Sequence, residues 1–172
     1  IISSMVDEID EYVDHVNSLR EKTLSPEAVA FMQDCEQRND YSNPKYQQYV
    51  EVMNKEYVDR KQPSKLEHLK DLGGDAVYHV FQGDNEFVIT GKLKDWHFRD
   101  QLSNIKVPTL LTFGEHETMP LDTAKKMDQL IPNSQLVTTP NGGHHHMVDN
   151  PDVYYKHLAD FIRQVEAGTF NK

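Results

Sequence analysis

The chain contains one cysteine, few basic residues and no long apolar run. Because Cys35 is the only cysteine, no disulfide can form within the chain, and we expect a reducing, cytoplasmic environment. The 18 lysines and arginines stand against 28 aspartates and glutamates, which gives a net charge of −10. Since nucleic acids and anionic membranes are bound by clustered positive charge, neither is an expected partner. No stretch approaches the roughly 20 apolar residues that span a bilayer.

The start of the chain lacks a methionine and lacks the basic lead of a signal peptide. Residues 1–6 instead form a short, mostly apolar run that is typical of a buried strand. A buried strand needs neighbours, and residues 7–70, which follow it directly, have a helical pattern. We therefore expect this chain to be cut from a larger protein, whose missing part holds the partners of this strand.

The pattern over residues 7–70 predicts helices throughout. Apolar residues recur at intervals of three and four along the first of them, at Ile9, Tyr12, Val13, Val16 and Leu19. Ser25–Pro26 and Asn43–Pro44 each combine an N-cap residue with proline at the first helical position. Ser64–Glu67 has the spacing of a capping box, and Gly73–Gly74 is a stop signal for the helix that it would begin.

A different pattern follows Ile105. Residues 107–114 and 135–139 are predicted to be strands, with a helix at 120–131 between them. A further helix is expected to begin at Asn150–Pro151. Strand, helix, strand, loop and helix in this order indicate the α/β class, with parallel strands and flanking helices.

Two loops follow these strands, at the carboxyl ends where ligands gather in parallel sheets. The acid loop, residues 114–120, carries glutamates, and the histidine loop, residues 141–146, carries three histidines. Glu117 and His144 follow the order of acid and histidine in α/β-hydrolases. A carboxylate that accepts one ring N–H fixes the tautomer and supports the imidazolium formed at the other nitrogen. The two residues are therefore predicted to belong to a catalytic triad.

Several blocks closely resemble the proline iminopeptidases and the related tricorn-interacting aminopeptidase factor. They are Asp84–Phe87, Thr90–Trp96, Ile105–Leu110, Asn43–Tyr46, and Gly143–His144 followed by Asp149. The resemblance covers essentially the whole chain and implies the C-terminal part of an α/β-hydrolase fold, so that the missing N-terminal half of the hydrolase core is an expected partner. It also implies three parts: a core strand at 1–5, a mostly helical cap at 6–104 (hereafter the cap segment), and the rest of the core at 105–172.

The resemblance further implies a reaction, the release of N-terminal proline or other N-terminal residues from a peptide through an acyl-enzyme on serine. His144 matches the catalytic base, and Glu86 matches the cap glutamate that binds the free α-amino group of the substrate. The family usually has Gly-Glu-x-Asp-Glu in the acid loop, where this chain is one residue short. Glu117 is either the triad acid, as counting from Gly114 favours, or an amine ligand beside a deleted aspartate, as counting back from Pro120 favours.

The nucleophile is not found in this sequence. None of the eight serines stands in a Gly-x-Ser-x-Gly context, and no His-Gly-Gly oxyanion motif occurs. We therefore expect this polypeptide alone to be inactive. Two alternatives remain: an inactive hydrolase remnant that acts as a binding module, or another capped α/β-hydrolase, such as an esterase or epoxide hydrolase. The latter would bind neutral substrates and would not need an amine-directed carboxylate.

The run His144–His146, with His116 nearby, also raises the question of a metal site. Adjacent histidines on a loop point in alternate directions, and no cysteine or His-x₃-His helix accompanies them. We therefore expect no metal and no other cofactor, and we expect His145 and His146 to be loop or packing residues. The expected binding partner is a peptide with a free N-terminus.

Overall fold

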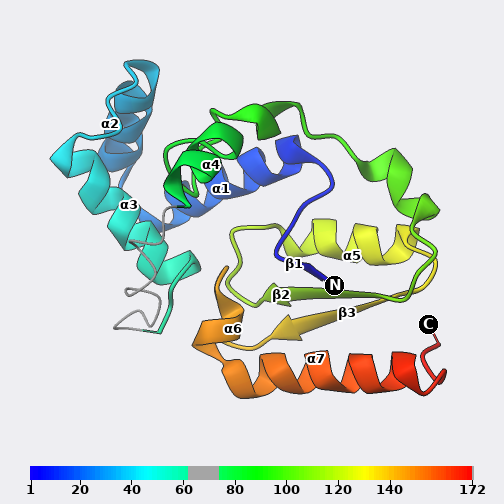
Figure 1. Cartoon of the computed structure of the whole chain (residues 1–172). Helices are drawn as coiled ribbons and strands as arrows, with labels where there is room; N and C mark the ends of the chain where they lie inside the picture. The colour runs from blue at the N-terminus through cyan, green and yellow to red at the C-terminus, as the bar shows by residue number, and fades with distance from the viewer. Residues whose placement is uncertain (62–73, 172) are drawn as a thin grey trace.

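The computed structural model describes residues 1–61 and 74–171 of the chain. Within them, parallel strands form one sheet in the order β1 (Ile2–Ser3), β2 (Thr109–Gly114) and β3 (Ser134–Thr139) (Figure 1). Leu111 of β2 is in register with Ile2 on one side and with Leu136 on the other. Every residue of β2 is buried, as expected for a central parallel strand that is covered on both faces. The predicted α/β class is confirmed.

One helix covers each face of this sheet, α5 (Leu121–Leu130) on one side and α7 (Pro151–Glu166) on the other (Figure 1). Successive residues of β2 serve the two faces, because side chains alternate along a strand. Leu111 and Phe113 join the core on the side of α5, whereas Leu110 packs with Val137 and with Phe161 of α7. The two strands and two helices predicted after Ile105 are therefore confirmed, within two residues of the predicted bounds.

The cap segment is mostly helical. Its elements are α1 (Ile9–Thr23), α2 (Pro26–Gln37), α3 (Pro44–Tyr57), α4 (Asp75–Phe81) and the 3-10 helices η2 (Lys92–Asp95) and η3 (Arg99–Asn104). The predicted N-caps are confirmed: Ser25 accepts from Ala28 N–H at 3.3 Å, and Asn43 accepts from Lys45 N–H at 3.0 Å. The helix predicted from Ser64–Glu67 to Gly73–Gly74 lies outside the described residues. No helix within the described ranges is long and apolar enough to cross a bilayer.

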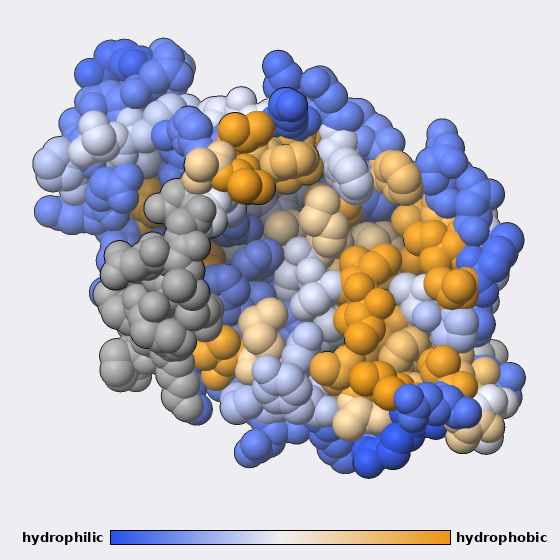
Figure 2. Space-filling model, in the orientation of Figure 1, coloured by the Kyte–Doolittle hydropathy of each residue, from blue (hydrophilic) through white to orange (hydrophobic). Residues whose placement is uncertain are grey.

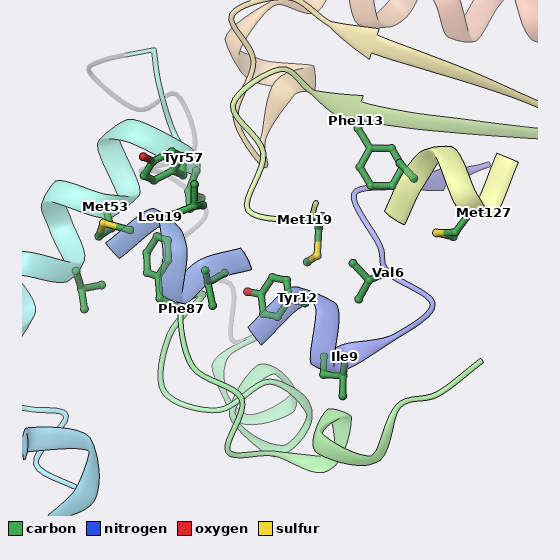
Figure 3. Packing of buried hydrophobic residues seen from close by; sticks show 14 of the residues in the cluster. Val6, Ile9, Tyr12, Leu19, Met53, Tyr57, Phe87, Phe113, Met119 and Met127 are labelled. Atoms are coloured by element: carbon green, nitrogen blue, oxygen red, sulfur yellow. The ribbon is translucent and has the colours of Figure 1, made fainter. Parts of the chain in front are cut away.

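One continuous core joins the cap segment to the sheet. The predicted apolar stripe of α1 is buried except for Val13, which is partly buried, and Tyr12 is inaccessible to solvent. The same cluster contains Met53 of α3, Phe87 of the cap segment and Met119 of the acid loop. In Figure 3, Met119 extends from its loop toward α1, where Tyr12 lies. This packing holds α1 against the acid loop, and so beside the carboxyl ends of the strands.

Candidate active site

The acid loop and the histidine loop lie against each other in backbone contact. His116 N–H donates to the Gly142 carbonyl at 2.8 Å, and Glu115 N–H donates to the Thr139 carbonyl at 3.0 Å. A Cβ atom at Gly114 would collide with the carbonyl groups of residues 142 and 143. Glycine at the end of β2 therefore allows the two loops to approach, because it has no side chain.

Glu117 and His144 form a hydrogen-bonded pair. The Nδ1 atom of His144 lies 2.9 Å from Oε1 of Glu117, whose side chain is fully buried. The other carboxylate oxygen accepts from the Ser4 hydroxyl at 2.6 Å and from Gly114 N–H at 3.2 Å. Burial opposes ionisation of this carboxyl, but the hydrogen bond and charge of His144, with the other donors, lower the pKa of Glu117 to about 2. An ionised carboxylate thus accepts the Nδ1–H proton and fixes the orientation of the ring.

The other nitrogen of His144 faces a second carboxylate. Nε2 lies 3.7 Å from Oε1 of Glu86, which follows α4 in the cap segment. Burial of the imidazole disfavours its charged form, but the negative charges of Glu86 and Glu117 raise the pKa of His144 to about 9. One imidazole therefore lies between two carboxylates that come from different parts of the chain.

Hydroxyl groups surround the carboxylate of Glu86. The Tyr78 hydroxyl donates to Oε2 at 2.8 Å, and the hydroxyls of Tyr12 and Thr118 lie 3.3 Å from Oε1. The Tyr12 hydroxyl also donates to the main-chain carbonyl of Glu86. Burial and the charge of Glu86 raise the pKa of both tyrosines, so both phenols stay protonated as donors.

A buried ion pair supports the loop that carries Glu86. Arg20 of α1 donates to the Phe87 carbonyl at 2.6 Å and lies 2.8 Å from a carboxylate oxygen of Glu36 in α2. The side chain of Asn85 accepts from Phe87 N–H at 2.9 Å. Because both neighbours of Glu86 are held in this way, the position of its carboxylate depends on the packing of α1 and α2.

The cap segment also holds the histidine loop, through residues 57–61 at the end of α3. The main-chain N–H groups of His144 and His145 donate to the carbonyls of Tyr57 and Val58 at 2.8 and 3.1 Å. The carboxylate of Asp149 accepts from Gly143 N–H and from Lys61 N–H, both at 2.8 Å. The backbone at His144 is therefore hydrogen-bonded directly to the cap segment.

The two histidines after His144 make other contacts. His145 lies 2.7 Å from a carboxylate oxygen of Asp59, which follows α3. His146 is completely buried, with Nε2 at 3.1 Å from the Thr112 hydroxyl, and burial lowers its pKa. Among residues 1–61 and 74–171, no group of three His, Cys, Asp or Glu side chains is arranged to hold a metal ion.

The structure brings all three predicted site residues, Glu86, Glu117 and His144, into one cluster. Ser4 was not expected there, although a hydroxyl residue directly after a strand is a signal that sequence reasoning can use. The hydroxyls of Tyr12, Tyr78 and Thr118 were also not expected. The tyrosines are placed by helices that are distant in sequence from the strand ends, and no local pattern points to them.

The sheet, the helices on its two faces and the acid–histidine pair at neighbouring strand ends define part of an α/β-hydrolase fold. Two solved structures share it. The crystal structure of proline iminopeptidase from Mycobacterium smegmatis has a TM-score of 0.80 at 24% identity, and covers 94% of this chain and 55% of that one. The crystal structure of VinJ has a TM-score of 0.82 at 22% identity, with coverage of 94% and 56%. At these identities the likeness concerns the fold.

Sequence comparison narrows the relationship. The proline iminopeptidase of Thermoplasma volcanium is 34% identical over 128 residues, which are 73% of this chain and 43% of that protein. The proline iminopeptidase of Chitinophaga pinensis is 29% identical over 179 residues, 99% of this chain and 59% of that protein. The chain is thus related to the proline iminopeptidases, and the predicted resemblance is confirmed. It spans about half the length of the curated relatives it matches. No family model matches the chain.

Proposed function

We propose that the complete protein containing this chain is a serine aminopeptidase that releases N-terminal residues, proline among them, from peptides. The observation that carries the proposal is the imidazole of His144 between Glu117 at Nδ1 and Glu86 near Nε2. In a substrate that loses one residue, the α-nitrogen is only two bonds from the scissile carbonyl carbon. A carboxylate that binds this nitrogen must therefore lie within a few ångströms of the catalytic base, as Glu86 does.

In this proposal His144 is the general base and Glu117 is the triad acid. Nε2 takes the proton of the serine hydroxyl and returns it to the leaving amine, while Glu117 fixes the tautomer and stabilises the imidazolium. The contact between Glu117 and Nδ1 supports the acid role over the amine-ligand role. We also propose that residues 1–5 and 105–172 belong to the hydrolase core, and that the cap segment supplies the amine-binding carboxylate.

The two carboxylates give substrate binding a further consequence. With both charges near the ring, the pKa of His144 is about 9, above the value near 7 that suits a general base at neutral pH. An ammonium group bound by Glu86 would offset one of these charges and lower the proton affinity of Nε2. Free-amine substrates would then promote the neutral form of the base that they need.

We propose that the serine nucleophile is carried by a neighbouring strand that pairs with the free edge of β1. Within the described residues, β1 pairs only with β2. Apolar side chains, including Ile2, Met5 and Val6, line a cavity of about 210 Å³ beside it. Figure 2 shows apolar surface over this side of the sheet and along α7. An unpaired strand edge with exposed apolar surface favours pairing with a further strand.

The test uses the full-length protein and two substrates, a prolyl arylamide with a free amine and an N-blocked prolyl ester. Glu86→Gln is expected to lower kcat/KM on the free-amine substrate about 10- to 100-fold, since bonds to charged groups contribute about 1.5–3 kcal/mol. The N-blocked ester should lose no activity, because it has no ammonium group for Glu86 to bind and because removing the charge of Glu86 lowers the pKa of His144 and so favours its neutral form. Asp84→Asn is the matched control, since it removes a charge from the same loop, where Asp84 lies 3.8 Å from His79.

Three outcomes contradict the proposal. Equal losses on both substrates would assign Glu86 a structural role. Hydrolysis of neutral esters without preference for a free amine would favour the esterase or epoxide hydrolase alternative. Absence of hydrolysis of either substrate by the full-length protein would favour the inactive binding module.

A further inference from the structure

We propose that Ser4 is a positioning residue of the triad, whose hydroxyl holds one oxygen of the Glu117 carboxylate so that the other faces His144. Each of three neighbouring parallel strands then supplies one group at its carboxyl end: Ser4 after β1, Glu117 after β2 and His144 after β3. The inference rests on the proposed roles of Glu117 and His144, and it adds a residue that is neither nucleophile, acid nor base.

The backbone places the Ser4 hydroxyl firmly. Ser4 N–H donates to the Thr112 carbonyl at 3.0 Å, which extends the β1–β2 ladder by one residue. Its φ of 47° lies in the left-handed region that side-chain-bearing residues rarely adopt. The residue is buried, and its hydroxyl donates to Oε2 of Glu117 at 2.6 Å. A buried serine with a strained backbone, whose hydroxyl makes a short hydrogen bond to an ionised carboxylate, indicates a functional role beyond linking β1 to α1.

The direction of the hydrogen bonds around Ser4 follows from proton counting. An ionised carboxylate can only accept, so the single hydroxyl proton of Ser4 goes to Glu117. Nδ1 of His146 lies 3.3 Å from the Ser4 oxygen, which must then accept there. Neutral His146 therefore carries its proton on Nδ1, and its Nε2 accepts from the Thr112 hydroxyl at 3.1 Å. Donation runs from His146 to Ser4 to Glu117, which also accepts from His144.

Glu117 needs such a restraint because it is a glutamate. Compared with the aspartate that is usual in the family, its side chain has one more methylene and one more torsion angle to fix. One of its main-chain donors, Gly114 N–H at 3.2 Å, lies at the end of β2, whereas Thr118 N–H at 3.0 Å belongs to the acid loop and would move with it. Ser4 directly follows β1 and its N–H is bonded to Thr112 of β2, so its hydroxyl ties the carboxylate to the sheet at a second strand.

The experiment compares Ser4 with its neighbour Ser3 in the full-length protein. Ser4→Ala is expected to lower kcat on the prolyl arylamide about 10- to 100-fold, the cost of misplacing a catalytic group by about 1 Å, with KM within about twofold. Ser4→Gly should show a similar loss, although glycine suits the left-handed backbone, because it also lacks the hydroxyl. Ser3→Ala is the control and should leave kcat unchanged, since the buried Ser3 hydroxyl has no hydrogen-bond partner among the described residues.

A double-mutant cycle tests the link to Glu117. In a Glu117→Asp background the shorter carboxylate cannot reach Ser4 and His144 together, so Ser4→Ala should cost less than about threefold. If Ser4→Ala lowers kcat as much in the Glu117→Asp background as in the wild-type background, the proposal is overturned and Ser4 has only a general structural role.

A second readout needs no turnover, and so separates this inference from the proposed activity. The proton on Nδ1 of His144, bonded to Glu117, is expected to give a downfield NMR signal in the full-length protein. Ser4→Ala and Ser4→Gly should shift or broaden this signal, whereas Ser3→Ala should not. If both Ser4 variants retain the signal and the kcat of the Ser3→Ala control, Ser4 does not position the acid. If peptidase activity is absent but the signal depends on Ser4, the proposed function fails and the positioning role stands.

Discussion

Two carboxylates flank the imidazole of His144, and the regions that supply them hold them differently. The sheet supplies Glu117, whose fully buried side chain accepts from main-chain N–H groups and from Ser4. The cap segment supplies Glu86, whose side chain is 12% exposed and accepts from the hydroxyl of Tyr78. The sheet thus fixes a carboxylate for a permanent partner within the protein. The carboxylate from the cap segment keeps some exposure to solvent, as the amine-binding role that we propose requires.

The supports of the two carboxylates differ as well. Glu117 follows β2, a strand fixed on both sides by main-chain hydrogen bonds. Glu86 lies in a loop held by side chains, among them the Arg20–Glu36 ion pair. The position of Glu117 should therefore tolerate changes in the cap helices better than the position of Glu86 does.

The largest expected effect comes from the carboxylate on the sheet. Glu117→Gln should lower kcat about 10⁴-fold, as loss of the triad acid does in serine proteases, because the amide no longer selects the Nδ1–H tautomer. Glu115→Gln changes a half-exposed glutamate of the same loop and should stay within about threefold. The measurement is kcat of the full-length protein on a prolyl arylamide. A loss below tenfold for Glu117→Gln would exclude Glu117 as the triad acid.

A smaller effect is expected from the support of Glu86. Arg20→Met should lower the free energy of unfolding by about 3 kcal/mol, because it leaves Glu36 without its buried partner. Arg38→Met removes an exposed ion pair with Asp34 and should leave the free energy of unfolding nearly unchanged. Urea unfolding of the full-length variants measures both. Similar values for the two would show that the buried pair does not stabilise the cap segment more than a surface pair.

The Glu117–His144 pair should also make stability depend on pH. The pKa of Glu117 is lowered to about 2, so its contribution is present above the unfolded value near 4.5 and is lost as pH falls through 2. The pKa of His144 is raised to about 9, so its contribution is present below 6.5 and is lost as pH rises through 9. Unfolding free energies should therefore peak between about pH 4.5 and 6.5.

Glu117→Gln isolates this contribution from those of other titrating groups. We expect the difference in unfolding free energy between wild type and variant to shrink, by on the order of 2 kcal/mol, toward both ends of the pH range. Urea unfolding at a series of pH values measures the difference. A difference that is constant from pH 3 to pH 9 would contradict the charged pair.

The smallest effect is expected from a single donor to Glu86. Tyr78→Phe removes the hydroxyl that donates to Oε2 and should raise KM for the free-amine substrate about fivefold, equivalent to about 1 kcal/mol. The N-blocked ester should be unaffected. Tyr155→Phe, at an exposed position of α7, is the matched control. An equal change on both substrates would separate Tyr78 from amine binding.

Much of this protein is determined by the sequence alone. Local patterns predict the helix starts at Ser25 and Asn43 and the strands around Phe113 and Val137. They also indicate the likeness to proline iminopeptidases. Local patterns suffice because N-caps, strand alternation and family motifs act over a few residues. The expectation that Glu117 and His144 meet also follows, since parallel strands deliver their following loops to one edge of a sheet.

Only the tertiary structure decided which ring nitrogen of His144 lies near each carboxylate. Counting along the acid loop left two roles open for Glu117, and the contact with Nδ1 supports the acid role that we propose. The Ser4 hydroxyl reaches Glu117 across 113 residues, and the Tyr12 hydroxyl reaches Glu86 across 74. Such contacts depend on how α1 and β1 pack against segments far away in the chain. The atom to which a hydroxyl donates is fixed by that packing, and no local pattern encodes it.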